Sequence, residues 1–166
     1  MQTYHTDINL VHEILKGSKT AFRDLYDRHS KGHMLTCLRY VKNRSDAEDV
    51  LQESYIKIYK DLDKYDSSKS QFNTWSTRVV INTCLMNLRK KNVFRDFDNI
   101  IDISCKLSVN ADAVDNLSLQ DLTNFITNLP KGYRTVFNMY VIDGYKHHEI
   151  ADHLKISVST SKTQLM

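Results

Sequence analysis

Between residues 147 and 165, small, apolar and polar residues follow a spacing that fits two short helices joined by a tight turn. Ala151 lies four residues after His147, and a small residue there lets two helices approach closely. Ile156 can fill the turn, and Ser157 can cap the next helix. A polar second helix can enter the major groove of DNA, so this pattern favours a helix-turn-helix motif over a plain helical hairpin. The polar face of that second helix carries Ser159, Thr160, Lys162 and Thr163.

A second group of polar residues lies in the stretch DAEDVLQESYIKIYKDLDKYD, residues 46–66. Asp49, Gln52 and Glu53 have the spacing that puts side chains on one face of a helix. This face is acidic, although residues 1–95 carry 17 Lys and Arg against 11 Asp and Glu. Such a face is usually only solvated, but the basic and aromatic segment that follows it favours a functional role.

That following segment is SQFNTWSTRVVINTCLMNLRKKN, residues 70–92, a polar loop leading into a helix. Aromatic side chains can stack on exposed bases, and arginines can follow phosphates, so the composition suits a single DNA strand. The aromatic residues are also candidates for the core, and for Trp75 we favour the core because large rings usually pack inward. The residues with this chemistry are Phe72, Trp75, Arg78, Asn82, Arg89, Lys90 and Lys91.

Histidines and cysteines give little support for a metal or redox site. His148 and Glu149 begin a near match to the H-E-x-x-H zinc motif, but His153 follows at i+5 and leaves the face that zinc needs. The three cysteines, Cys37, Cys84 and Cys105, form no C-x-x-C pair. We therefore expect no metal and no cofactor, and a small helical metalloenzyme using His148 and Glu149 is only a remote alternative.

These residues must be positioned by helices. With 4 glycines and 1 proline in 166 residues, the chain contains few residues that break helices. Helical spacing begins near Asp7, and Ser45 to Glu48 read as a capping box for the helix behind them. A long helix is predicted over 72–91. We expect its core face to include Trp75, Val79, Asn82, Leu85, Met86 and Leu88.

Charge and periodicity predict two small helical domains, an all-α fold. Residues 1–95 carry a net charge of +6, residues 96–116 carry −4, and residues 117–166 carry +1. The acidic middle segment lacks periodicity, so we interpret it as a flexible linker. Domain boundaries are therefore expected at 1–95 and 117–166. A basic domain joined flexibly to a second domain fits a protein that binds nucleic acid.

Taken together, these segments resemble the bacterial sigma-70 family, and within it the extracytoplasmic-function (ECF, group 4) sigma factors. AFRDLYDRH is similar to region 2.1, DAEDVLQESYIKIY to region 2.2, and FNTWSTRVVINTCLMNLRKK to regions 2.3 and 2.4. LPKGYRTVFNMYVIDGYKHHEIADHLKISVSTSKTQL is similar to region 4. The resemblance implies a factor that binds core RNA polymerase, melts the promoter −10 element and starts transcription, and it implies no enzymatic activity.

The resemblance also implies roles for single residues. Asp49, Gln52 and Glu53 match the face that docks on the β′ clamp helices of core polymerase, and the region 4-like domain is expected to meet the β flap. Ser159, Thr160, Lys162 and Thr163 match the helix that reads the −35 element of promoter DNA. The residues expected to bind the −10 element are Tyr65, Lys69, Arg78, Asn82, Arg89 and Lys90.

The chain departs from the family pattern at two places. Ile81 stands where many relatives have arginine, which predicts a less basic region 2.4. The sequence stops at Met166, inside the expected recognition helix, where relatives continue into an arginine-rich end. We therefore expect a shortened −35-reading helix and weak binding to isolated −35 duplex, because each lost phosphate contact lowers affinity.

The resemblance also implies a protein partner. Factors of this group are usually held by an anti-sigma factor, which is often anchored in a membrane.

No apolar run of this chain approaches the ~20 residues that span a bilayer, and residues 1–9 show no signal peptide, so we expect a cytoplasmic protein without direct membrane insertion. The alternative is a helix-turn-helix regulator that does not bind core polymerase as a sigma factor.

Overall fold

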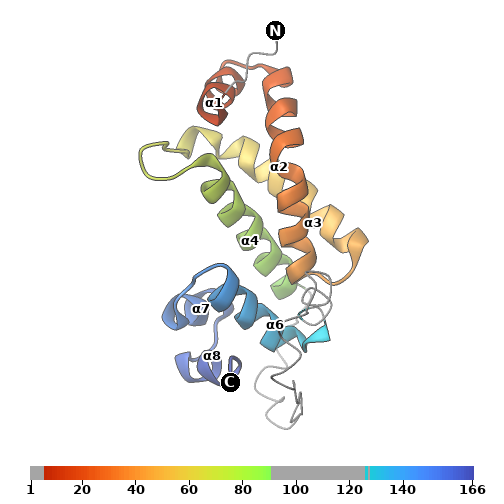
Figure 1. Ribbon diagram of the computed structural model, residues 1–166, viewed down its shortest axis with the longest axis vertical. Coiled ribbons are helices and arrows are strands. Elements are labelled where there is room, and N and C mark those ends of the chain that lie inside the picture. The colour runs from red at the N-terminus through yellow and green to blue at the C-terminus, as the bar shows by residue number, and fades with distance from the viewer. Residues whose placement is uncertain (1–5, 91–125, 127) are drawn as a thin grey trace, which may run out of the picture. The chain divides into compact units, whose positions relative to one another are not determined.

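The computed structural model describes residues 6–90, 126 and 128–166, and every regular element in this part of the chain is a helix (Figure 1). This confirms the prediction of an all-α fold. The chain divides into two compact units, Met1–Asn87 and Leu88–Met166. The predicted linker at 96–116 lies outside the described residues.

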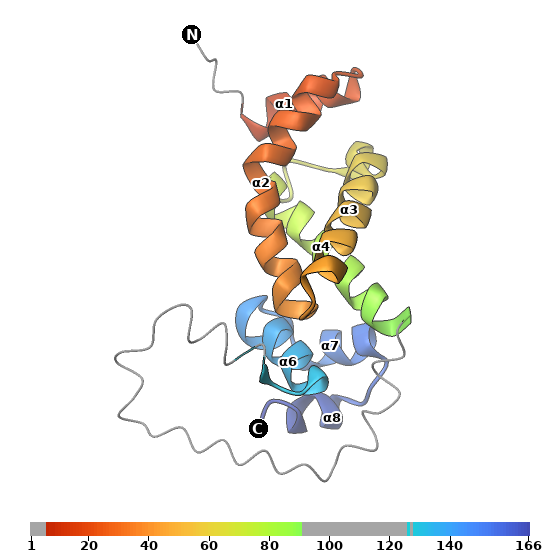
Figure 2. The same cartoon turned by 90° about the vertical axis from the view of Figure 1, so that its right-hand side faces the viewer.

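The described part of the first unit consists of three α-helices, a short 3-10 helix and most of a fourth α-helix, α4, whose residues 88–90 belong to the second unit. Helix α2 packs against both α1 and α3, and the 3-10 helix η1 contacts α1 and α3. Figures 1 and 2 show α1 lying across the N-terminal end of α2. The elements, in chain order, are α1 (Asp7–Leu15), α2 (Lys19–Tyr40), α3 (Arg44–Lys60), η1 (Leu62–Lys64) and α4 (Phe72–Lys90).

Local capping explains where these helices begin. The Thr6 hydroxyl accepts a hydrogen bond from the Asn9 N–H at 3.3 Å and caps α1. The predicted capping box at Ser45 is wrong, because α3 begins earlier, at Arg44. Its cap is Asn43, whose side-chain oxygen accepts from the Ser45 N–H at 2.8 Å. Asparagine caps at least as well as serine, so the earlier residue starts the helix.

The buried face of α4 is rotated from the predicted one. Leu85 and Leu88 are buried as expected, but Asn82 and Met86 are exposed and Trp75 is only half-buried. Ile81 is buried at 2% exposure, so it belongs to the core and does not lower the charge of the surface of α4. The residues of α4 that form its buried face are Phe72, Ser76, Val80, Ile81, Thr83, Cys84, Leu85 and Leu88.

In the second unit, the described helices are α6 (Lys131–Phe137), the π-helical turn η3 (Asn138–Ile142), α7 (His147–Leu154) and α8 (Val158–Thr163). The wider π turn changes the phase of the helix, and Tyr140 and Val141 are exposed there. Lys155 takes the left-handed conformation, with φ 58°, and ends α7. The predicted turn at 155–157 between the last two helices is confirmed.

Candidate functional site

An open groove of about 670 Å³ lies between α2 and α3. Asp49 and Gln52 line it, as do Ile56 and Tyr59, which are 51% and 54% exposed. Spacings of three and four residues put these four side chains on one face of α3. The groove therefore joins an acidic side chain to exposed apolar surface, a combination suited to binding another protein. Its lining consists of Phe22, Tyr26, Glu48, Asp49, Leu51, Gln52, Tyr55, Ile56, Tyr59 and Lys60.

The third residue of the predicted acidic face, Glu53, is not part of the groove lining. Its carboxylate forms an ion pair with Lys57, with 2.8 Å between Oε1 and Nζ. The same ammonium group donates to the Thr83 hydroxyl of α4 at 3.4 Å. The structure thus brings Asp49 and Gln52 together in the groove and turns Glu53 toward α4.

Aromatic residues build one wall of the groove. The ring centroid of Tyr55 lies 4.6 Å from that of Tyr26 and 6.3 Å from that of Phe22. Phe22 also meets Tyr59 edge-on at 5.2 Å. Sequence spacing did not single out Phe22 or Tyr26. The available signal was in α3, where Ile56 and Tyr59 repeat the spacing of Asp49 and Gln52.

Beneath the groove, His33 connects three helices. Its Nδ1 lies 2.9 Å from the Tyr55 hydroxyl of α3, and its Nε2 lies 3.2 Å from the Ser76 hydroxyl of α4. The imidazole is 1% exposed. Burial, and secondarily the charge of His29, lowers the pKa of His33 to about 4. Burial also raises the pKa of Tyr55, with smaller contributions from Tyr26 and Cys37.

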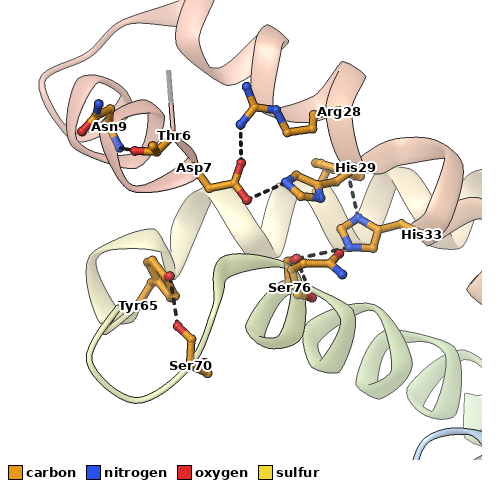
Figure 3. A network of polar contacts seen from close by, with 11 residues as sticks. Thr6, Asp7, Asn9, Arg28, His29, His33, Tyr65, Ser70 and Ser76 are labelled. Atoms are coloured by element: carbon orange, nitrogen blue, oxygen red, sulfur yellow. Dashed lines mark hydrogen bonds and ion pairs between the residues drawn. The ribbon is translucent and has the colours of Figure 1, made fainter. Parts of the chain in front are cut away.

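The loop before α4 contains an aromatic cluster formed by Tyr65, Phe72 and Trp75. The Tyr65 ring centroid lies 5.6 Å from that of Phe72 and 5.4 Å from that of Trp75. The Tyr65 hydroxyl donates to the Ser70 carbonyl at 3.1 Å and closes the loop (Figure 3). Tyr65 therefore shapes the loop, while Lys69 is exposed and its ammonium group lies 3.4 Å from the Asp66 carboxylate.

One face of α4 is polar and basic. Arg78, Asn82 and Arg89 are exposed and separated by four and seven residues, so they lie along a single stripe of the helix. Lys90 is exposed at the end of the same helix. Guanidinium and amide groups on one stripe can follow a phosphate backbone and hydrogen-bond to base edges. The structure thus places three of the residues predicted to bind the −10 element on one stripe, with Lys90 at the end of the same helix.

The second unit holds the helix-turn-helix. The Ser157 hydroxyl accepts from the Thr160 N–H at 2.9 Å and lies 2.8 Å from the Thr160 hydroxyl, so Thr160 is partly used in capping α8. Ser159, Lys162 and Thr163 are exposed on α8. The Thr163 hydroxyl donates to the Ser159 carbonyl at 3.1 Å, so its proton is used within α8.

His147, the first residue of α7, orients α8. Its Nδ1 lies 2.9 Å from the hydroxyl of Ser161, which is fully buried. Its ring stacks on Tyr140, with centroids 4.4 Å apart and an interplanar angle of 20°. The sequence pattern did not point to this contact, because it joins residues fourteen positions apart across a turn.

Over residues 6–90, 126 and 128–166, no group of three or more His, Cys, Asp and Glu side chains is arranged to hold a metal ion. In the same residues, no helix is both long enough and apolar enough to cross a membrane.

Comparison with known proteins decides the family. The model for sigma-70 region 2 matches residues 25–93, and the model for sigma-70 region 4 matches residues 119–166. The ECF RNA polymerase sigma factor SigW of Bacillus subtilis (strain 168) is 30% identical over 166 residues, which cover 93% of this chain and 88% of SigW. This chain is an ECF sigma factor. It directs transcription initiation, so the predicted family is confirmed and the alternative of a regulator that is not a sigma factor is set aside.

A second curated relative agrees with this assignment. The ECF RNA polymerase sigma-E factor of Escherichia coli (strain K12) is 28% identical over 171 residues, covering 96% of this chain and 88% of the relative. Among solved structures, the sigma factor RpoE of Bartonella quintana has 17% sequence identity and a TM-score of 0.49, covering 87% of this chain and 89% of RpoE.

The matched regions contain most of the surfaces described above. In this sigma factor, region 2 includes α3, the loop at 65–71 and α4, and region 4 includes the helix-turn-helix of α7 and α8. Helix α1 and Phe22 precede the region 2 match, which begins at residue 25. Helix α1, which contacts η1 just before this loop, therefore lies outside the matched region.

Proposed function

We propose that this sigma factor binds core RNA polymerase through the groove between α2 and α3, with Asp49 and Gln52 as its polar contacts and Glu53 beside it. The single observation that supports this surface is the combination, in one groove, of exposed apolar side chains and the acidic residues that match region 2.2. Apolar contacts provide binding energy, and the charge selects the partner and its orientation. The expected docking element is the clamp-helix pair of β′.

The DNA contacts are assigned to two surfaces. The loop at 65–71, with Lys69, captures a melted −10 base, and the stripe of Arg78, Asn82 and Arg89, with Lys90 at the end of the helix, follows the adjacent backbone. Extruding a base costs a few kcal/mol, which stacking and pocket contacts must offset. In the second unit, Ser159 and Lys162, with Thr160 and Thr163 beside them, read the −35 duplex. This unit is also the expected contact for the β flap.

The role is assembly of an initiation complex in the cytoplasm, without catalysis. We expect an anti-sigma factor as a further partner, because ECF factors are usually held by one. The Bartonella quintana RpoE structure is a complex with the anti-sigma factor NepR. An antagonist of this chain would compete with polymerase for the groove or for the α4 stripe.

Reconstituted transcription tests the proposal. Purified chain and core polymerase are given a genomic fragment library, and the transcripts identify the promoters that the holoenzyme selects. Asp49→Lys is expected to weaken core binding about tenfold. Asp24→Lys, an equal charge change at an exposed position of α2 outside the groove, is the matched control. Equal core affinity of Asp49→Lys and the wild-type chain would remove the groove from the polymerase interface.

A further inference from the structure

Helix α1 is tied to α2 by one carboxylate. Asp7, the first residue of α1, places Oδ1 2.6 Å from the Arg28 guanidinium and Oδ2 3.0 Å from Nε2 of His29 (Figure 3). The side chains of Asp7 and His29 are only 26% and 11% exposed. Partial burial reduces solvent screening, so this contact holds α1 more firmly than an ordinary surface ion pair does.

The other side of the His29 ring faces the start of α4. Its centroid lies 5.3 Å from that of Phe72, which is 2% exposed and is the first residue of α4. His29 also stacks on His33, with centroids 6.0 Å apart. His29 therefore lies between the carboxylate of α1 and the residue at which the loop enters α4.

Phe72 transmits this contact to the loop. Its ring centroid lies 5.6 Å from that of Tyr65 and 5.8 Å from that of Trp75. Burial raises the pKa of Tyr65 most, and the nearby negative charge of Asp7 raises it further. Helix α1 and η1, which precedes Tyr65, are in contact as well. Two routes thus join α1 to the aromatic cluster.

The loop needs such support because its residues are polar and its internal hydrogen bonds join only residues that are close in the sequence. Within residues 65–71, hydrogen bonds and an ion pair join Tyr65 to Ser70, and Asp66 to Ser68, Lys69 and Ser70. A loop held only by such contacts pays an ordering cost when it binds a ligand. Fixing Phe72 from outside removes part of that cost before DNA arrives.

We propose that Asp7 and His29 are positioning residues through which α1 holds the loop 65–71 and its aromatic cluster in the conformation that captures the −10 base. The inference rests on the proposed function of that loop. It adds to the promoter-binding machinery a helix that precedes the matched region 2. Neither residue is expected to touch DNA.

The test uses holoenzyme made from the full chain and core polymerase, and a single-stranded oligonucleotide carrying the −10 sequence of a promoter that the wild-type holoenzyme selects. Asp7→Asn keeps the size of the side chain and removes its charge, and is expected to weaken oligonucleotide binding about fivefold. Asp7→Glu restores a carboxylate and should recover most of the affinity. Glu13→Gln, an equal charge loss on the exposed side of α1, is the matched control and should bind as the wild type does.

Affinities for core polymerase and for −35 duplex are measured on the same variants. An unchanged −10 affinity in Asp7→Asn overturns the proposal. Equal losses of core and −10 affinity also overturn it, because α1 would then support only the fold. If Asp7→Asn is unfolded at the assay temperature, His29→Gln, which removes the ring against Phe72, must show the −10 loss instead. If the wild-type holoenzyme does not bind the oligonucleotide, the function proposed for the loop is refuted. If the wild-type holoenzyme binds it and Asp7→Asn binds equally well, only the role proposed for α1 is refuted.

Discussion

The buried imidazole of His33 makes the first unit sensitive to acid. The Ser76 hydroxyl has one proton and lies 3.2 Å from both the Asn73 carbonyl and Nε2 of His33. With that proton on the Asn73 carbonyl, Nε2 donates to Ser76 and Nδ1 accepts from the Tyr55 O–H. A second proton on Nδ1 would break that arrangement and place a charge in a site that burial and His29 already make unfavourable for it.

The magnitude follows from the two pKa values. His33 has a pKa of about 4 in the folded chain, against an ordinary value of 6.5. Between these values the unfolded chain binds the proton and the folded chain does not, so unfolding becomes easier as the pH falls. Lowering the pH from 7 to 5 should reduce the free energy of unfolding by about 2 kcal/mol through this residue alone.

Urea unfolding at pH 7 and pH 5 measures this loss. Trp75 is the single tryptophan of the chain and lies in the first unit, so its fluorescence reports that unit. His33→Gln removes the titrating group, and its stability should depend on pH by about 2 kcal/mol less than that of the wild type. His12→Gln, at an exposed position of α1, is the control and should keep the wild-type dependence. An equal loss of stability in wild type and His33→Gln would refute the argument.

Three further outcomes are expected. Tyr59→Ser, which removes an exposed ring from the groove, should weaken core polymerase binding about tenfold in a pull-down titration while the circular dichroism spectrum stays unchanged; full affinity would contradict the groove assignment. Ser157→Ala should destabilise α8 by about 1 kcal/mol, measured as weaker −35 duplex binding at each salt concentration, and wild-type binding would show that the cap is dispensable. Lys162→Ala should lower −35 affinity and reduce the salt slope by nearly one unit, and an unchanged slope would place Lys162 away from phosphate.

The sequence by itself determined the features that depend on neighbours in the chain. The scarcity of Gly and Pro and the helical spacing predicted an all-α protein, and the turn at 155–157 with its Ser157 cap predicted α7 and α8 correctly. These features are set by hydrogen bonds and side-chain contacts within one or two helical turns, so a linear pattern is enough to find them. The ordered similarity of four segments added the family, which the comparisons confirmed.

Tertiary structure decided which faces are buried and which distant residues meet. Helix α4 has apolar residues on several sides, so only packing against its neighbours could bury Ile81 and expose Asn82 and Met86. The same holds for Glu53, whose spacing fits the acidic face but whose ion pair with Lys57 faces α4. The contacts of Asp7 with His29 and of His33 with Ser76 join residues 22 and 43 positions apart. No local periodicity encodes such pairs, because the packing of whole helices brings them together.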